Sequence, residues 1–159
     1  MQSEIFVENN TGEDLTELAI APWQTWITVW LGDLKKTLPE ATGYEVTLRF
    51  TDDAEIHQLN AQYRQKDQPT DVLSFAALED NLGIPLPEEE PLYLGDIIVS
   101  TDTAKRQAIA HDHSLQVELG WLVSHGLLHL LGWDHPDDDS LEKMLNRQAV
   151  LLRKVQLIP

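Results

Sequence analysis

Alternation of apolar and polar residues is clearest over residues 44–51, and a period of two is typical of a strand with one buried face. Three other segments are short, apolar and rich in β-branched or aromatic residues, as strands are. These further predicted strands cover residues 4–7, 71–76 and 93–100. A loop rich in Pro and Glu, at about residues 78–91, joins the last two, and we expect it to be mobile.

Helical spacing, in which apolar residues recur every three or four positions, marks most of the remaining chain. The predicted helices cover residues 22–36, 52–63, 101–110, 114–131 and 137–154. The first carries a stripe of tryptophans, Trp23, Trp26 and Trp30, which we interpret as core packing rather than as a ligand site. Strands and helices in this order predict an α/β (α+β) fold: a single domain over residues 1–159, with a small mixed β-sheet covered by helices.

Composition narrows the classes of function. The chain has no cysteine, so a bound metal would need His, Asp or Glu ligands. No segment reaches membrane-spanning length and no signal peptide is visible, so we expect a soluble, cytoplasmic protein without membrane contact. The formal net charge of −16 opposes non-specific binding to nucleic acid, and an RNA site would have to be a local basic cleft. Two acidic runs, at residues 88–90 and 137–139, are interpreted as a solvated loop and a helix start.

Half of the six histidines fall in one short segment, at His125, His129 and His135. The first two are four residues apart on a predicted helix, so their side chains project from one face and can share a metal ion. Gly132 can take the left-handed conformation that ends the helix and returns His135 to the same ion. Three histidines with a water in the fourth position is the arrangement of a catalytic zinc, so we predict one Zn²⁺ per chain, bound by a His-x3-His-x5-His helix-turn.

Spacing alone does not identify the reaction. Zinc peptidases with similar spacing carry a glutamate directly after the first histidine as the general base, and this chain has Gly126 there. The base therefore has no assignment, and Asp134 is either an acceptor that orients a ligand ring or a proton-transfer group. We find no comparable geometry for His57, His111 and His113, and interpret them as surface or capping residues.

Three segments together resemble the YbeY endoribonuclease family. They are LNAQYRQKDQPTDVLSF at residues 59–75, LGDII at 94–98 and HGLLHLLGWDH at 125–135. Their order and spacing resemble those of the family as well, and the similarity spans about residues 44–145. The chain departs from the family at Ala76, where proline is frequent, and in the long acidic loop that follows.

The resemblance implies an α/β fold and a metal-dependent, single-strand-specific endoribonuclease that acts in ribosomal RNA maturation and ribosome quality control. The implied partners are a single-stranded ribosomal RNA precursor, the small ribosomal subunit and its assembly factors. The resemblance carries the zinc ligands onto the three histidines already named, and the functionally important arginine onto Arg64. The side chain of Arg64 suits this role, because a planar guanidinium can bind a phosphate or a developing phosphorane charge. Lys66 adds a point charge beside it in the sequence.

Two other functions stay open on the sequence alone. One is a zinc metallohydrolase of another class, such as a peptidase, which the ligand helix favours and Gly126 opposes. The other is a non-catalytic ribosome-assembly factor that binds RNA, in which zinc is structural and Arg64 only binds phosphate.

Few cations are available to oppose the acidic surface. They are Arg64 and Lys66, with Lys105 and Arg106. We therefore expect a shallow salt dependence of RNA binding, with a log–log slope of magnitude about 2 to 3.

Overall fold

A four-stranded mixed sheet organises the computed structural model, which describes residues 2–77 and 91–159. Its strands, in spatial order, are β1 (Gln2–Asn9), β2 (Gly43–Thr51), β4 (Leu92–Ser100) and β3 (Val72–Ala76). The first three run parallel, and β3 lies antiparallel to β4 at one edge. All four predicted strands are confirmed. Most of the predicted mobile loop, including the acidic run at residues 88–90, lies outside the described residues.

Five α-helices occur in the described part of the chain: α1 (Ile20–Asp33), α2 (Asp53–Arg64), α3 (Thr101–Ala110), α4 (Leu115–Leu130) and α5 (Asp138–Lys154). The 3-10 helices η1 (Thr16–Leu18) and η2 (Lys35–Thr37) flank α1. The prediction of one helix over residues 22–36 is therefore only partly right, because the last turn tightens into η2. Among the described residues, no helix is both long enough and apolar enough to cross a membrane.

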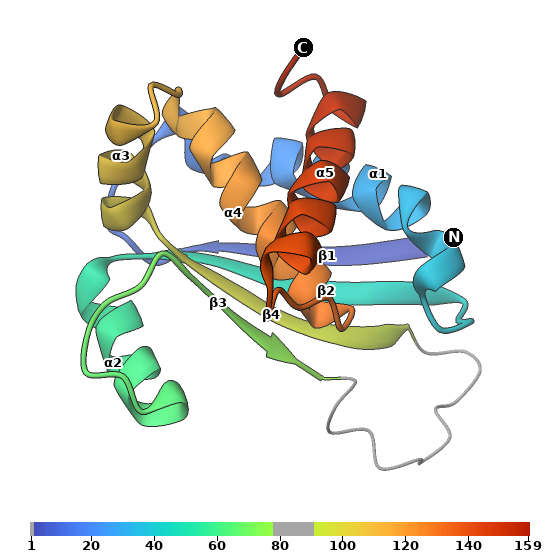
Figure 1. The fold of residues 1–159 in the computed structure, drawn as a ribbon, viewed down its shortest axis with the longest axis horizontal. Helices are drawn as coiled ribbons and strands as arrows, with labels where there is room; N and C mark the ends of the chain where they lie inside the picture. The colour runs from blue at the N-terminus through green and yellow to red at the C-terminus, as the bar shows by residue number, and fades with distance from the viewer. Residues whose placement is uncertain (1, 78–90) are drawn as a thin grey trace.

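The sheet separates two apolar layers (Figure 1). Helices α1, α4 and α5 lie over one face of the sheet, and α2 lies on the other. The larger layer includes Trp23 and Trp30, both fully buried, which confirms that the tryptophan stripe belongs to the core. The smaller layer consists of Ile56 from α2 packed against Leu73 and Ile98. The structure is thus the small α/β domain that the sequence predicts.

Side chains cap the N-termini of helices α2, α4 and α5. Asp52 accepts a hydrogen bond from the backbone N–H of Glu55 at the start of α2, and Ser114 accepts one from Val117 at the start of α4. Asp137 forms a capping box at the start of α5, which confirms that the acidic run at residues 137–139 is a helix start. Each cap satisfies N–H groups that have no partner within the helix, so the sequence fixes where these helices begin.

Candidate metal centre

The three predicted ligands meet at the end of α4. His125 and His129 lie one turn apart on this helix, with their Nε2 atoms 2.9 Å from each other. The ring centre of His135 lies 5.2 Å from that of His125 and 5.3 Å from that of His129. One ring nitrogen of each histidine is within 4.8 Å of the other two. The side chains are therefore placed so that they can hold one metal ion together.

The chain returns His135 to the helix through a tight turn after α4. Gly132 has a φ of 93°, the left-handed conformation that the sequence predicts for it. The backbone N–H of Gly132 donates to the carbonyl of His129 at 3.1 Å, and that of Trp133 donates to Leu128 at 3.0 Å. Asp134 accepts a hydrogen bond from the backbone N–H of His135 at 2.8 Å. The Asp134 carboxylate thus shapes the backbone of this turn.

A buried amide fixes the ring of His125. Gln148 of α5 is 2% exposed, and its Nε2 donates to the carbonyl of Trp121 at 2.9 Å and to Ser124 Oγ at 3.3 Å. Its Oε1 is then left to accept from His125 Nδ1, 3.3 Å away. With Nδ1 carrying the proton, the Nε2 lone pair of His125 faces the other two histidines, as a metal ligand requires.

Sequence reasoning missed Gln148, although a signal existed. On α5 it shares an apolar stripe with Met144, Leu151 and Leu152, all of which are buried. A polar residue at such a position needs a hydrogen-bonding partner inside the protein. That requirement points to an internal polar group opposite α5, which the structure shows to be His125.

The surroundings of the histidines favour their neutral form. Burial lowers the pKa of His125, and the neighbouring rings of His129 and His135 lower it further. Burial also lowers the pKa of His129, against an opposing hydrogen bond with the backbone of Trp133. Neutral imidazole is the form that ligates a metal, so these two side chains are prepared for that role near neutral pH.

The helix face next to His125 is closed by the sheet. A Cβ added at Gly126 would lie 2.7 Å from Ile97 Cγ2 and 3.1 Å from Ser74 Oγ. Ser74 Oγ also donates to the carbonyl of Gly126 at 3.0 Å, which ties α4 to β3. The position that holds the general base in zinc peptidases therefore points into the core here, and a glutamate has no room there.

Gly126→Ala should lower the free energy of unfolding by about 1–2 kcal/mol, because the overpacking cost exceeds the gain in helix propensity. Gly32→Ala in α1 is the matched control, since an added Cβ there meets nothing within 4 Å. Urea denaturation of both variants measures the difference. If Gly126→Ala were as stable as Gly32→Ala, the contact between α4 and the sheet would be looser than the structure shows.

The histidines open onto a cavity of about 680 Å³ between β3, the end of α2 and the turn after α4. Arg64 and Lys66 line this cavity together with the three histidines. The helix predicted over residues 52–63 stops one residue short of Arg64, which the structure shows to be the last residue of α2. Its Nη2 donates to the carbonyl of Ser74 at 2.6 Å, and its guanidinium carbon lies 5.4 Å from the ring centre of Phe75. The arginine is thus held at the cavity by the edge strand β3.

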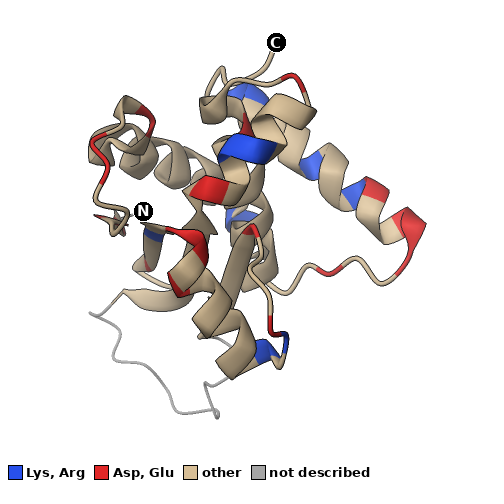
Figure 2. Ribbon diagram, turned by 90° about the vertical axis from the view of Figure 1, so that its left-hand side faces the viewer, with Lys and Arg blue, Asp and Glu red and all other residues tan. Residues whose placement is uncertain are grey.

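Two further cations that the sequence grouped with Arg64 are engaged elsewhere. Lys105 forms an ion pair with Glu13 at 2.6 Å, and Arg106 forms one with Asp53 at 2.8 Å. Neither lines the cavity that contains the histidines, so their predicted place in the RNA-binding group is not supported. Figure 2 shows acidic segments spread over the helices and loops in this view, with fewer basic segments among them.

Comparisons with known proteins agree with this geometry. The profile of the family described as Endoribonuclease YbeY matches residues 7–156. Endoribonuclease YbeY of Picosynechococcus sp. is 71% identical over 159 residues, covering 100% of this chain and 98% of that protein. Endoribonuclease YbeY of Nostoc sp. is 55% identical over 145 residues, covering 88% of this chain and 77% of that protein.

A solved structure extends the comparison to the fold. The solution structure of TM1509 from Thermotoga maritima is similar to this chain with a TM-score of 0.58 and 26% sequence identity. The match covers 97% of this chain and 89% of that one. The similarity therefore includes the N-terminal strand and α1, which lie outside the three sequence motifs.

Proposed function

Because the chain belongs to the YbeY family of endoribonucleases, we propose that the cavity lined by His125, His129, His135 and Arg64 is where it cleaves RNA. Membership of the family makes the protein a nuclease that acts on RNA in ribosomal RNA processing. The finer proposal is a zinc-dependent, single-strand-specific endoribonuclease that also serves ribosome quality control. The observation that carries it is that three histidine donors and one arginine line the same cavity.

The proposed ligands are His125, His129 and His135, which together hold one Zn²⁺ at this site. Three neutral imidazoles suit zinc and leave a coordination position for water or substrate. Zinc at such a site supplies Lewis acidity, which polarises a phosphate oxygen and acidifies water. Gln148 keeps the proton of His125 on Nδ1, so this residue contributes by orienting a ligand.

Arg64 is proposed to bind the scissile phosphate and to stabilise the charge that develops on it. A guanidinium has a planar fork of N–H donors, of which the structure uses Nη2 on the carbonyl of Ser74, and the others remain for substrate. Lys66 is proposed as a weaker contact to a neighbouring phosphate. Position 126 has no room for a glutamate, which argues against the peptidase alternative.

The proposed substrate is a single-stranded ribosomal RNA precursor, met on the small ribosomal subunit together with assembly factors. A cavity of about 680 Å³ suits a flexible single strand, whereas an A-form duplex has a fixed backbone that cannot bend into it. We also propose that residues 1–159 act as one endoribonuclease domain, which the family match over residues 7–156 supports.

Cleavage assays on the purified chain test the proposal. We expect the protein to cut single-stranded RNA, to leave casein intact, and to lose activity with a chelator and regain it with added Zn²⁺. Cleavage of casein instead would favour the peptidase alternative. Binding of RNA without cleavage, with every divalent metal supplied, would favour a non-catalytic assembly factor.

The salt dependence of RNA binding should be even shallower than the sequence suggests. With Lys105 and Arg106 paired to acids, only Arg64 and Lys66 line the cavity as cations among the described residues. Single-stranded nucleic acid gives a log–log slope of roughly 0.7 per neutralised phosphate, so we expect a magnitude of about 1 to 2. Titration of a labelled single strand against salt measures it. A slope of about 4 or more would require a larger basic surface than the cavity provides.

A further inference from the structure

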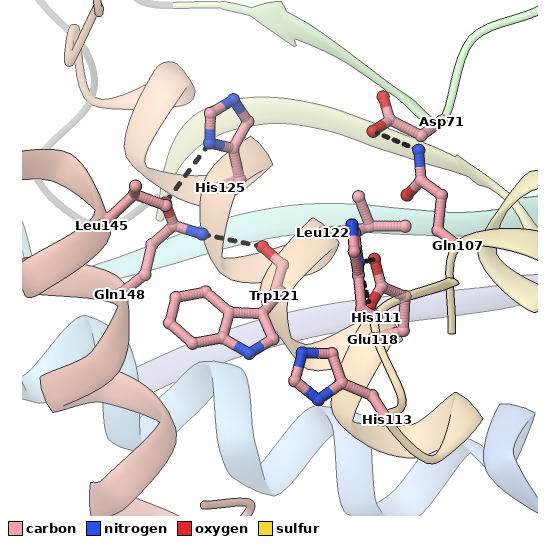
Figure 3. A pocket seen from close by; sticks show the side chains of 10 residues that line it. All are labelled: Asp71, Gln107, His111, His113, Glu118, Trp121, Leu122, His125, Leu145 and Gln148. Atoms are coloured by element: carbon pink, nitrogen blue, oxygen red, sulfur yellow. Dashed lines mark hydrogen bonds and ion pairs between the residues drawn. The ribbon is translucent and has the colours of Figure 1, made fainter. Parts of the chain in front are cut away.

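A second group of side chains that could hold a metal ion lies where α3 meets α4 (Figure 3). It consists of His111, His113 and Glu118, and one donor atom of each lies within 4.8 Å of the other two. His111 and His113 are exposed, as the sequence predicts for surface residues. The expectation that they have no geometry comparable to the first three histidines is wrong, because α4 brings Glu118 beside them.

The turn that carries the two histidines is held by hydrogen bonds of its own backbone. His111 N–H donates to the carbonyl of Gln107 at 2.8 Å, and His113 N–H donates to the carbonyl of Ala108 at 2.9 Å. Asp112 between them is left-handed, with a φ of 56°. Ser114 then begins α4 as its cap. The backbone at His111 and His113 is therefore positioned by the end of α3 and the start of α4.

Glu118 gives this group its distinctive chemistry. Its side chain is 4% exposed, and both carboxylate oxygens lie 3.1 Å from His111 Nδ1. A carboxylate removed from water is costly unless a cation or hydrogen-bond donors compensate it. In the described structure, the basic partner of Glu118 is the exposed ring of His111, a weak base compared with Lys or Arg.

We propose that His111, His113 and Glu118 form a second binding site, for a divalent transition-metal ion such as Zn²⁺ or Co²⁺. Two imidazoles and one carboxylate are a donor set that such ions accept, and this set differs from the three histidines of the first site. The ion would neutralise the buried carboxylate more fully than one imidazole does. The two exposed rings can turn to reach it, because their side chains are not fixed by packing.

The site opens onto a cavity of about 450 Å³ that Trp121 and Gln107 also line. This cavity shares Asp71 and His125 with the cavity of the first site. An ion bound by the second group would therefore face a space that adjoins the RNA-binding cavity, and its remaining coordination positions would be open to water. Two of its three ligands are exposed side chains, which lose rotamer freedom when they bind an ion, so we expect weaker binding than at the first site.

Metal titration of the full-length, metal-free chain tests the proposal. With Zn²⁺ by calorimetry, or with Co²⁺ by visible absorption, we expect two ions per chain. A His129→Ala/His135→Ala protein removes ligands of the first site only, and it should still bind one ion. Adding His113→Ala to that protein should weaken the remaining ion at least about tenfold. Adding His57→Ala instead should leave it unchanged, since His57 pairs with Asp67 and belongs to neither group.

The titration measures metal binding and not RNA cleavage, so failure of the second metal site can be told apart from failure of the proposed function. Absence of a bound ion from the His129→Ala/His135→Ala protein would overturn the proposal and leave His111 and Glu118 as a simple ion pair. Retention of the ion after His113→Ala would overturn the assignment of its ligands. His113 is exposed, so its replacement should not disturb folding, which circular dichroism checks. A failure of RNA cleavage in the parent protein would bear on the proposed function and not on this site.

Discussion

Replacement of His129 by alanine should release the ion held by the three histidines and lower RNA cleavage by roughly 10³-fold or more. The Nε2 atom of His129 lies 2.9 Å from that of His125. Two remaining imidazoles bind zinc much more weakly than three. Loss of the Lewis acid removes several kcal/mol of transition-state stabilisation, which corresponds to a rate loss of that order. Elemental analysis after dialysis and a single-turnover cleavage assay measure both effects.

The same result is expected for His125→Ala and His135→Ala, since each removes one of the three donors. His57→Ala is the matched control, because it removes a histidine that pairs with Asp67 outside the cavity. It should keep full activity and metal content. Were the three ligand variants to retain the metal content of the parent after dialysis, the assignment of the metal centre would be wrong.

Arg64→Ala should lower kcat/KM for RNA by roughly 10²-fold to 10³-fold while leaving the metal content intact. That is the usual loss when one fixed donor to a developing charge is removed. The structure places the Arg64 guanidinium at the cavity wall, held by the carbonyl of Ser74. Arg64→Lys should recover little, because an ammonium cannot contact phosphate through two parallel N–H groups.

Lys66→Ala provides the comparison for Arg64, since both side chains line the cavity. Its effect should be small, a few-fold on KM and little on kcat, because a single point charge contributes mainly to phosphate binding. Urea denaturation of Arg64→Ala tests whether a loss of activity comes instead from lower stability, caused by the missing contact with Ser74 of β3. If Arg64→Ala cleaved RNA at the parental rate, the arginine would be reduced to a structural contact with Ser74.

The cluster of three histidines was predictable because its members are close together in the sequence. His125 and His129 are fixed by the period of the helix, and the left-handed Gly132 controls the return of His135. The strands, helix caps and tryptophan core were predictable for a similar reason, since each depends on a short pattern of side chains. The end of α1 was harder to predict, because sequence patterns locate helix ends poorly. In the structure the last turn of the predicted helix tightens into η2.

What the sequence did not predict depends on contacts between distant segments. Gln148 meets His125 only when α5 packs against α4, and Glu118 meets His111 only through the turn between α3 and α4. The engagement of Lys105 by Glu13 joins residues far apart in the chain, so sequence proximity to other cations was misleading. The sheet order likewise arises from pairing between distant strands, for which a single sequence carries no local signal.

Close packing on two sides of α4 restricts how this protein can change over evolutionary time. Gly126 lies against the sheet, and a Cβ at Gly120 would come within 2.8 Å of Leu157, which belongs to the segment after α5. A helix held on both sides cannot slide or rotate to suit a new substrate without displacing His125 and His129 from the cluster of three histidines. Divergence of RNA preference within this lineage should therefore accumulate on the opposite wall of the cavity, at the end of α2 and along β3, while α4 changes slowly.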